Sequence, residues 1–467
     1  MKKARLPIIP TGLQGLDNVI LEGGLPQYSL NIVCGPPGSG KTIFCYQMLF
    51  SNVGNQNKAV CFSTISEPPI KTLRYLQQFS FFEPEKFKEH IKLRDLSTAL
   101  KDVKEGKGIE VVINFIREEI EKEQASFVLI DSFKAISSII GGQDAMRRLI
   151  YGLAAELSVL QCTAFLIGEY TENEALIDPV FNIADGIIVL SSDRKGYLRR
   201  NYIEVLKMRG TDYFAGRHRF LIDSSGVNVY PRLRPMEVPI PPEACERKRI
   251  KTGISGLDKM TNGGLYLGSA TLLAGQSGTG KTIFSLKFLD EGARLNQKGL
   301  YVSFEETPPN LFSLAKTTGV ELDRLIREER VILRHFSPVE LSVDKFHYQL
   351  ISLIKENKVE RVVIDSISDI SITIADPVNL RNYLLSLVTQ LSELGVTLLL
   401  ASEIPEERFG ITQTQLSVVI DAIITLRYKE ADEMIKRVIS VIKMRGSNHD
   451  KRIREYEITD NGLVIKE

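Results

Sequence analysis

The sequence lacks the features that mark several specialised classes of protein. Its 59 lysines and arginines are balanced by 58 aspartates and glutamates, a formal net charge of +1, so no strong overall field draws it to nucleic acid or to an anionic membrane. No stretch reaches the ~18 apolar residues of a membrane span, and the N-terminal MKKARLPIIPTG has charge but no apolar signal-peptide core. The five cysteines are scattered without CxxC spacing, which favours reduced thiols. We therefore expect a cytoplasmic protein without a membrane partner, and we do not expect nucleic acid as its main partner.

What the chain does have is length and a balanced composition. Its 467 residues exceed the ~250–300 at which a single core stops growing. Hydrophobic residues make up 43% and charged residues 25%, as in ordinary globular proteins. Two globular domains are the expectation.

The sequence also repeats itself once. Four segments return in the same order, with offsets between 234 and 241: TGLQGLD (11–17) as TGISGLD (252–258), GPPGSGKT (35–42) as GQSGTGKT (275–282), FVLIDS (127–132) as RVVIDS (361–366), and VLKMRG (205–210) as VIKMRG (441–446). Offsets this constant indicate a duplicated domain. Residues between the copies are rich in proline and then in basic side chains, which suits a stiff, solvated linker. We predict a first domain over 1–232, a linker over 233–250 and a second domain over 251–467.

Each copy alternates short apolar runs with amphipathic stretches. Runs such as SLNIVCG and TAFLIGE are continuous, as in parallel strands that are buried on both faces. Stretches such as DAMRRLIYGLAAELSVL read as the helices between them. The predicted fold class is α/β, with a mainly parallel central sheet in each domain.

Both copies carry a phosphate-binding loop. GPPGSGKT and GQSGTGKT match GxxxxGK[ST] and lie between a predicted strand and a predicted helix, where backbone N–H groups and the helix N-terminus can cradle phosphates. Lys41 and Lys281 would reach the β- and γ-phosphates, and Thr42 and Thr282 would ligate Mg²⁺. The predicted ATP-binding residues of the two loops are Gly38, Ser39, Gly40, Lys41, Thr42 and Ile43, and Ser277, Gly278, Thr279, Gly280, Lys281, Thr282 and Ile283.

Carboxylates follow the strands in both copies. Asp131 and Asp365 end apolar runs, as does the acidic residue that positions Mg²⁺ in such sites, although an aspartate at this place can also cap a helix. Earlier in each repeat, VCFSTISEPP (60–69) matches YVSFEETPPN (301–310). Aligned on their shared Phe and Pro, these segments place Glu305 and Glu306 opposite Ser66 and Glu67.

The glutamates of this segment are the candidate catalytic bases. A carboxylate at the end of the strand after the phosphate-loop helix can face the γ-phosphate and accept a proton from water or a hydroxyl. Glu67, Glu305 and Glu306 are the predicted catalytic residues, and Glu305 is also a predicted neighbour of the metal. Capping of the next helix is the alternative. With one carboxylate fewer, the first site is expected to hold ATP more than to hydrolyse it.

Two cations close each copy. Lys207 and Arg209, and Lys443 and Arg445, alternate along an extended segment, so both members of each pair face one side. They could clamp a γ-phosphate in the same subunit or across an interface. A solvated strand edge is the alternative.

Taken together, the phosphate loops, the strands ending in Asp131 and Asp365, FEETPP, and the pair KMRGT and KMRGSNHD resemble the KaiC family of tandem RecA-like P-loop ATPases. The resemblance covers essentially the whole chain. It implies homohexameric double rings with Mg²⁺ and ATP at subunit interfaces, slow hydrolysis in the first domain, and autokinase and autophosphatase activity in the second. It also implies that the first ATP site is completed by Lys207, Met208, Arg209, Thr211 and Asp223, and the second by Arg437, Lys443, Met444, Arg445, Ser447 and His449.

The chain departs from the family pattern at three places. Ser66 stands at the place assigned to the first catalytic glutamate of domain one. The family's Ser-Thr phosphorylation pair falls on Ser417 and Val418, which leaves Ser417 as the expected acceptor, with Thr412 as the auxiliary one. The sequence given stops at NGLVIKE, where clock members continue into a tail that engages KaiA. We therefore expect no regulation by KaiA, while a KaiB-like partner fits the resemblance.

The sequence thus predicts a regulatory, KaiC-like ring ATPase with serine autokinase activity in its second domain. Two other functions stay open. A RecA- or DnaB-like motor on single-stranded DNA would use a basic loop with stacking aromatics, for which SSDRKGYLRRNY (191–202) is the candidate and a charged hairpin the alternative. A nucleotide-gated scaffold without catalysis is the other.

Overall fold

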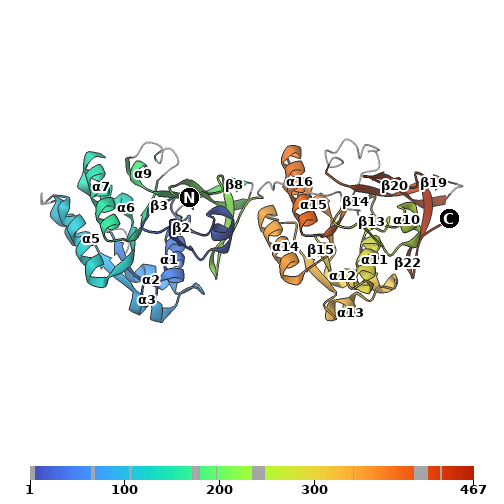
Figure 1. Ribbon diagram of the computed structural model, residues 1–467, viewed down its shortest axis with the longest axis horizontal. Coiled ribbons are helices and arrows are strands. Elements are labelled where there is room, and N and C mark those ends of the chain that lie inside the picture. Colours follow the sequence, from blue (N-terminus) through green and yellow to red (C-terminus); the bar gives the residue numbers. More distant parts are fainter. Residues whose placement is uncertain are drawn as a thin grey trace, which may run out of the picture. The chain divides into compact units, whose positions relative to one another are not determined.

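The computed structural model describes the chain except residues 1–5, 65–68, 105–107, 142, 171–173, 175–178, 196, 234–247, 340, 404–418, 432–433 and 467. It divides into two compact units, Met1–Arg232 and Leu233–Glu467 (Figure 1). Each unit is built on a nine-stranded sheet. None of the described helices is both long and apolar enough to span a membrane.

The sheet of the first unit has the order β11-β10-β9-β8-β3-β7-β6-β4-β5. Strands β8, β3, β7, β6, β4 and β5 run parallel, whereas β9, β10 and β11 add antiparallel pairs at one end. The bounds are β3 (Leu30–Cys34), β4 (Lys58–Ser63), β5 (Ile91–Asp95), β6 (Ala125–Asp131), β7 (Thr163–Gly168), β8 (Gly186–Lys195), β9 (Leu198–Met208), β10 (His218–Asp223) and β11 (Gly226–Tyr230). Every residue of β3 and β7 is buried, because helices cover both faces of the sheet.

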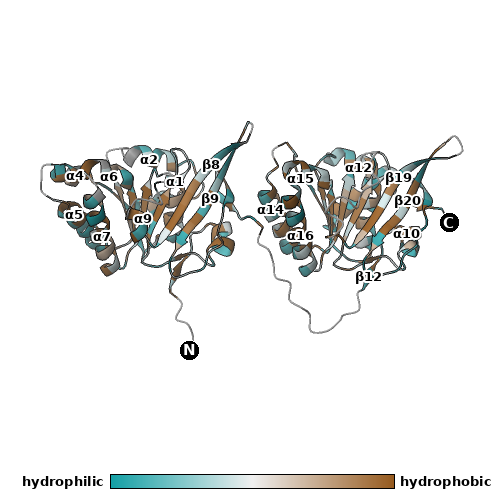
Figure 2. Cartoon of the chain, turned by 90° about the horizontal axis from the view of Figure 1, so that it is seen from above, coloured by the Kyte–Doolittle hydropathy of each residue, from teal (hydrophilic) through white to brown (hydrophobic). Residues whose placement is uncertain are grey.

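Two layers of helices enclose this sheet. One core joins it to α1 (Lys41–Asn52), α2 (Pro69–Leu76) and α3 (Pro84–His90). The other joins its opposite face to α4 (Ser97–Lys104), α5 (Glu110–Glu123), α6 (Phe133–Ile140), α7 (Gln143–Val159) and α9 (Pro179–Ile183). Short elements precede β3, namely β1 (Ile8–Ile9), the π-helix η1 (Leu16–Ile20) and β2 (Leu25–Pro26). Figure 2 shows that the strands β8 and β9 are brown within the sheet and teal where they extend beyond it, and that α5 and α7 have teal outer surfaces.

The second unit repeats the topology, in the order β16-β15-β17-β18-β14-β19-β20-β21-β22. Its strands are β14 (Ala270–Gly275), β15 (Gly299–Ser303), β16 (Val331–His335), β17 (Arg361–Asp365), β18 (Thr397–Glu403), β19 (Ala422–Ala431), β20 (Met434–Met444), β21 (Arg454–Thr459) and β22 (Gly462–Ile465), with a small pair of β12 (Arg249–Ile250) and β13 (Leu265–Tyr266). Helices α10 (Ser255–Met260), α11 (Lys281–Arg294), α12 (Pro308–Thr317) and α13 (Leu322–Arg327) share one core, and α14 (Val343–Asn357), α15 (Ile367–Thr373) and α16 (Pro377–Glu393) share the other. The predicted α/β class with mainly parallel sheets is confirmed.

Each sheet therefore has two edges of different character. At the carboxyl edge the parallel strands end, and at the amino edge they begin. Strands β9 and β20 run against their neighbours, so their last residues lie at the amino edge: Met208 pairs with Gly186, the first residue of β8, and Met444 pairs with Ala422, the first residue of β19. These two edges position the candidate sites.

One core position has different residues in the two repeats, and a change at a second position compensates for the difference. In the second unit, Arg361 is fully buried at the start of β17 and its Nη1 donates to the carbonyl oxygens of Lys251 and Phe288, at 2.9 and 2.8 Å. The first unit has Phe127 at that position, and Asn52 Nδ2 donates instead to the corresponding carbonyls of Pro10 and Met48, both at 2.8 Å. Position 292, which corresponds to Asn52, is glycine, and a Cβ there would lie 2.6 Å from Cδ of Arg361. The equivalent pair of carbonyls is thus bridged by a side chain of β17 in the second unit and by a side chain of α1 in the first.

Candidate nucleotide sites

The first phosphate loop lies at the carboxyl edge between β3 and α1. Gly38 and Gly40 have φ of 70° and 94°, a left-handed conformation that favours glycine. Lys41 Nζ donates to the carbonyls of Gly35 and Pro36 at 2.9 and 3.0 Å. Burial lowers the pKa of Lys41, while the negative charges of Glu169 and Asp131 oppose that shift. The lysine is thus held folded over the loop, where phosphate oxygens can replace the two carbonyls.

The second loop has the same conformation between β14 and α11. Gly278 and Gly280 have φ of 74° and 92°, and Lys281 Nζ donates to the carbonyls of Gly275 and Gln276, both at 2.9 Å. The hydroxyl of Tyr456 donates to the carbonyl of Thr279 at 2.6 Å and fixes the loop to β21. Of the other predicted loop residues, Ser39 and Ile283 are buried, Ile43 is half-buried and Ser277 is exposed.

A threonine–aspartate pair stands beside each loop. Thr42 Oγ1 donates to Asp131 Oδ2 at 2.8 Å, and Thr282 Oγ1 donates to Asp365 Oδ2 at 3.1 Å. A hydroxyl and a carboxylate in contact are oxygen donors of the kind that Mg²⁺ takes in nucleotide sites, so these residues fit the expected metal.

Tyr301 is a neighbour of the second pair that sequence reasoning missed. Its hydroxyl donates to the same Asp365 oxygen at 2.6 Å. Burial raises the pKa of Asp365, and the hydrogen bonds from Tyr301 and Thr282 oppose that shift. The signal was a tyrosine within an otherwise aliphatic strand, at a position where the first copy has Cys61.

The two glutamates of the second site have different surroundings. Glu305 Oε1 accepts a hydrogen bond from Ser366 Oγ at 3.3 Å, and its charge acts on Lys281. Burial, followed by the nearby Asp369 carboxylate, raises the pKa of Glu305. Glu306 Oε2 instead accepts from Asn310 Nδ2, on α12, at 3.3 Å. Glu305 is therefore the member of the pair that lies towards the phosphate-loop lysine.

The predicted alignment of this segment is wrong. Ser63 pairs with Asp131 as Ser303 pairs with Asp365, and the next residues, Thr64 and Phe304, donate to the carbonyls of those aspartates. Four residues then lead to Pro69 and Pro309 in both copies, so Glu305 and Glu306 correspond to Ile65 and Ser66, and Glu67 corresponds to Thr307. The error came from the anchor: Phe62 lies within β4, whereas Phe304 follows β15. The first copy lacks both members of the pair, and Glu67 itself lies outside the described residues.

The KMRG cations lie at the amino edge of their own sheets. Lys207 Nζ donates to the carbonyls of Phe181 and Asn182, both at 3.1 Å, and Arg209 Nη2 donates to the carbonyl of Asn182 at 3.2 Å. In the second unit, Lys443 Nζ donates to the carbonyl of Ile420 at 2.7 Å, and Arg445 Nη1 lies 4.0 Å from Asp421 Oδ1. Each pair does face one side, as predicted, but that side is away from the phosphate loop of the same unit.

The remaining predicted residues divide between the two edges. At the carboxyl edge, Asp223 ends β10 and Arg437 lies across from Tyr428, whose backbone N–H donates to the phosphate-loop residue Gln276. At the amino edge, with the KMRG cations, lie Met208, Thr211, Met444, Ser447 and His449. The predicted acceptors Ser417 and Thr412 lie outside the described residues.

The candidate DNA-binding loop forms a paired hairpin. Residues of 191–202 belong to the ladder of β8 and β9, with Ser191 opposite Tyr202 and Arg194 opposite Arg199. Arg219 stacks on the ring of Tyr202, 5.2 Å from its centroid. This agrees with the charged-hairpin interpretation.

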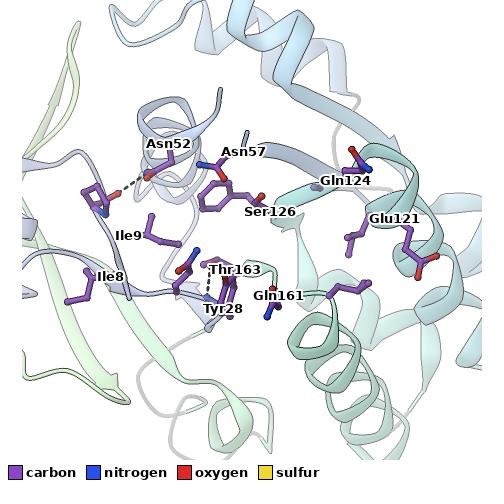
Figure 3. A pocket seen from close by; sticks show the side chains of 16 residues that line it. Ile8, Ile9, Tyr28, Asn52, Asn57, Glu121, Gln124, Ser126, Gln161 and Thr163 are labelled. Carbon is purple, nitrogen blue, oxygen red and sulfur yellow. Dashed lines mark hydrogen bonds between the residues drawn. The ribbon is translucent and has the colours of Figure 1, made fainter. Parts of the chain in front are cut away.

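A cavity of about 660 Å³, separate from the phosphate-loop site, opens at the amino edge of the first unit. Figure 3 shows Asn52 and Asn57 on one side of it and Tyr28 and Gln161 on another. Among the described residues that line it none is cationic, and Glu121 adds a carboxylate. Such a lining does not suit a polyphosphate. The cavity of about 690 Å³ around Lys41, Thr42 and Asp131 does, because it combines a cation, the loop backbone and oxygen donors.

Comparison with known proteins agrees with this geometry. A model of the KaiC ATPase family matches residues 9–234 and 250–467. The chain is 30% identical over 476 residues to the circadian clock oscillator protein KaiC of Picosynechococcus sp., covering 98% of this chain and 89% of that protein. It is 30% identical over 479 residues to KaiC of Thermostichus vulcanus, covering 99% and 90%, and 29% identical over 484 residues to KaiC 1 of Synechocystis sp., covering 98% and 89%. Two matched repeats, two phosphate loops and full-length similarity together place this chain in the KaiC family of tandem RecA-like ATPases.

Proposed function

We propose that the chain is a regulatory ATPase that assembles head to tail into a homohexameric ring, with Mg²⁺ and ATP bound between neighbouring copies. The observation that carries this proposal is the separation of each site into two halves. The phosphate loop, the Thr–Asp pair and Glu305 lie at the carboxyl edge, whereas Lys443 and Arg445 lie at the amino edge.

One copy cannot bring both halves to one ATP. Strand β14 has six residues and spans about 17 Å between the two edges. Lys443 is tied to the carbonyl of Ile420, just before β19 at the amino edge. A neighbouring copy that turns its amino edge to this phosphate loop would complete the site. Such a contact joins two different surfaces, and repeated contacts of this kind close into a ring when the rotation allows it. The number six comes from the family resemblance.

The residues at the carboxyl edge suit hydrolysis. Lys281 and the loop N–H groups would bind the β- and γ-phosphates, and Thr282 and Asp365 would hold Mg²⁺, which neutralises phosphate charge when bound. Glu305 would accept the proton of the attacking water, and the neighbour's Lys443 and Arg445 would stabilise the charge that develops on the phosphates. The first unit has Ile65 and Ser66 in place of the pair. We assign most of the turnover to the second domain and a mainly ATP-holding role to the first.

The experiment that tests this division is subunit complementation. The variants Lys281→Ala and Arg445→Ala damage opposite halves of the second site, so each alone should lose the phosphate release of the second domain. In rings reassembled from an equal mixture, about a quarter of the interfaces join an intact phosphate loop to an intact cation pair. Phosphate release should recover to about that fraction of the second domain's rate. The control mixture of Lys281→Ala with Glu305→Gln damages one half twice and should recover nothing, whereas equal recovery in both mixtures contradicts the proposal.

The second domain is also proposed to phosphorylate Ser417. The resemblance supports this assignment, because Ser417 keeps the acceptor position of the family, and Val418 has no hydroxyl to take a phosphoryl group. After incubation with Mg-ATP, phosphopeptide mapping should find one main phosphate in peptide 412–421, with Thr412 a secondary site. Ser417→Ala and Glu305→Gln should both remove the main phosphate. A wild-type peptide without phosphate, in an assembled ring, would leave an ATPase without autokinase activity.

The pH dependence of the second domain should reflect the shifted Glu305. A general base acts only when ionised, and burial together with Asp369 raises the pKa of this carboxyl. The rate of phosphate release should therefore be maximal above the raised pKa of Glu305. As the pH is lowered, the rate should begin to decrease at a higher pH than it would with an ordinary glutamate as the base. Removing the nearby charge in Asp369→Asn should move this acid limb to lower pH. Phosphate release measured from mildly acidic to neutral pH tests this, and an unmoved limb in Asp369→Asn would contradict it.

A further inference from the structure

The first nucleotide site has lost its catalytic pair but retains a different carboxylate. Ile65 and Ser66 occupy the positions of Glu305 and Glu306. The cavity around Lys41 is nevertheless lined by two carboxylates in the described part of the chain, Asp131 and Glu169. Asp131 accepts the hydrogen bond of Thr42 and is the expected metal neighbour. Glu169 has no role in the predictions made from the sequence.

Glu169 lies directly beside the phosphate loop. Gly168, the last residue of β7, pairs with Cys34, the last residue of β3, so Glu169 follows at the level of Gly35. The carbonyl of Gly35 accepts a hydrogen bond from Lys41 Nζ. Among the charges that act on Lys41, that of Glu169 is the largest. Within the described residues the Glu169 carboxylate forms no hydrogen bond and is exposed, which leaves it available to a water or a ligand in the cavity.

The second unit has the same carboxylate. Glu403 ends β18 and pairs with Gly275, the first residue of the second phosphate loop. Its charge acts on Lys281 as that of Glu169 acts on Lys41. Both copies therefore have a glutamate at the end of the strand next to the loop, while only the second copy has the pair Glu305 and Glu306. In the first copy this glutamate is the carboxylate left over after the metal neighbour is assigned.

A free carboxylate at this place is unfavourable for a site that only holds ATP. Its negative charge repels the negatively charged γ-phosphate. A glutamine would bind the same nucleotide better. The position makes physical sense if the carboxylate takes part in the reaction, where its charge stabilises a proton that leaves water.

We propose that Glu169 is the catalytic carboxylate of the first nucleotide site, where it accepts a proton from the water that attacks ATP. The water oxygen bonds to the γ-phosphorus, the bond from that phosphorus to the β,γ-bridging oxygen breaks, and the bridging oxygen leaves with the electron pair on ADP. The proton passes to Glu169 and then to solvent. This inference rests on the proposed ATPase function and gives the slow turnover of the first domain a named base.

The test uses the full-length chain with the second site silenced by Glu305→Gln and Glu306→Gln. In this background, Glu169→Gln should lower the kcat for phosphate release by at least about 100-fold, the lower range for a general base. It should leave the affinity for the non-hydrolysable analogue AMPPNP equal or higher, because a repulsive charge is removed. A purely structural role would instead weaken analogue binding along with turnover. Glu169→Asp, which retains the carboxylate, should keep part of the activity.

Glu121→Gln in the same background is the matched control, because Glu121 is a glutamate of the same unit that lines the cavity at the amino edge, away from the phosphate loop. It should change kcat by less than about threefold. The proposal is overturned if Glu169→Gln retains a kcat within about threefold of the background, if it weakens AMPPNP binding in proportion to kcat, or if the background releases no phosphate while the wild type does. In that last case the ATPase function stands and the first site only holds ATP. A wild type that releases no phosphate would overturn the ATPase function itself.

Discussion

Replacing Glu305 by glutamine is expected to lower phosphate release from the second domain by about 10²–10⁴-fold, because a positioned general base contributes that much to a proton-transfer step. Glutamine has nearly the shape of glutamate and can still contact Ser366, so the change removes the base and little else. Phosphate release by the full-length variant should fall to the rate of the first domain alone. Analogue binding and native mass should stay as in the wild type.

Glu306→Gln is the matched comparison for this prediction. Glu306 accepts its hydrogen bond from Asn310 on α12, whereas Glu305 is held by Ser366 next to Asp365. The loss of rate should therefore be smaller for Glu306→Gln. If Glu306→Gln is the more damaging change, the assignment of the base within the pair is wrong, although the placement of turnover in the second domain stands.

Replacing Arg361 by phenylalanine is expected to destabilise the second unit by about 2–5 kcal/mol, because the core loses the hydrogen bonds that Arg361 donates to the carbonyls of Lys251 and Phe288. Burial lowers the pKa of this guanidinium to about 10, so it is charged at neutral pH and its hydrogen bonds are charge-assisted. Hydrogen exchange followed by mass spectrometry should show protection in α11 and β17 reduced by at least about tenfold, with the first unit unchanged.

The first unit supplies the compensating change. Gly292→Asn should restore most of the protection in Arg361→Phe, because Asn52 bridges the matching carbonyls beside Phe127. Alone, Gly292→Asn should destabilise, since its Cβ would meet Cδ of Arg361 at 2.6 Å. If Arg361→Phe and Gly292→Asn each destabilise the unit but together destabilise it little, the double-mutant cycle gives a favourable coupling free energy. Effects that simply add would show that the two bridges are not equivalent.

Much of the fold was predictable because the pattern is local. The continuous apolar runs became strands β3, β7 and β14, which are buried at every residue. The repeated motifs indicated two copies of one topology. The phosphate loops and the Thr–Asp pairs followed from spacing alone, since each depends on a loop and on the end of a strand. The positions of the KMRG cations did not follow, because they depend on β9 and β20 running against their neighbours.

The missed residues depend on contacts between distant segments. Glu169 lies beside the loop because β7 is the neighbour of β3 in the sheet, and the sequence does not tell which strand takes that place. Tyr301 reaches Asp365 from an adjacent strand. The glutamate alignment failed for a related reason: two phenylalanines matched in the sequence but lie at different places in the strand register. A single residue type shared by two segments is a weaker guide to which positions correspond than the pairing of their strands.

The exchange of Asn52 for Arg361 also bears on how the two repeats can evolve. Repeated sequences invite recombination within one gene, and a crossover between the α1 and β6 segments would produce two hybrid units. One hybrid would join Asn52 to Arg361, so that two donors compete for one pair of carbonyls in a space that holds one of them. The other would join Gly292 to Phe127, so that neither side chain donates a hydrogen bond to the two carbonyls. At this pair of positions each repeat is internally consistent and incompatible with half of the other, so a crossover between α1 and β6 should destabilise both hybrid units.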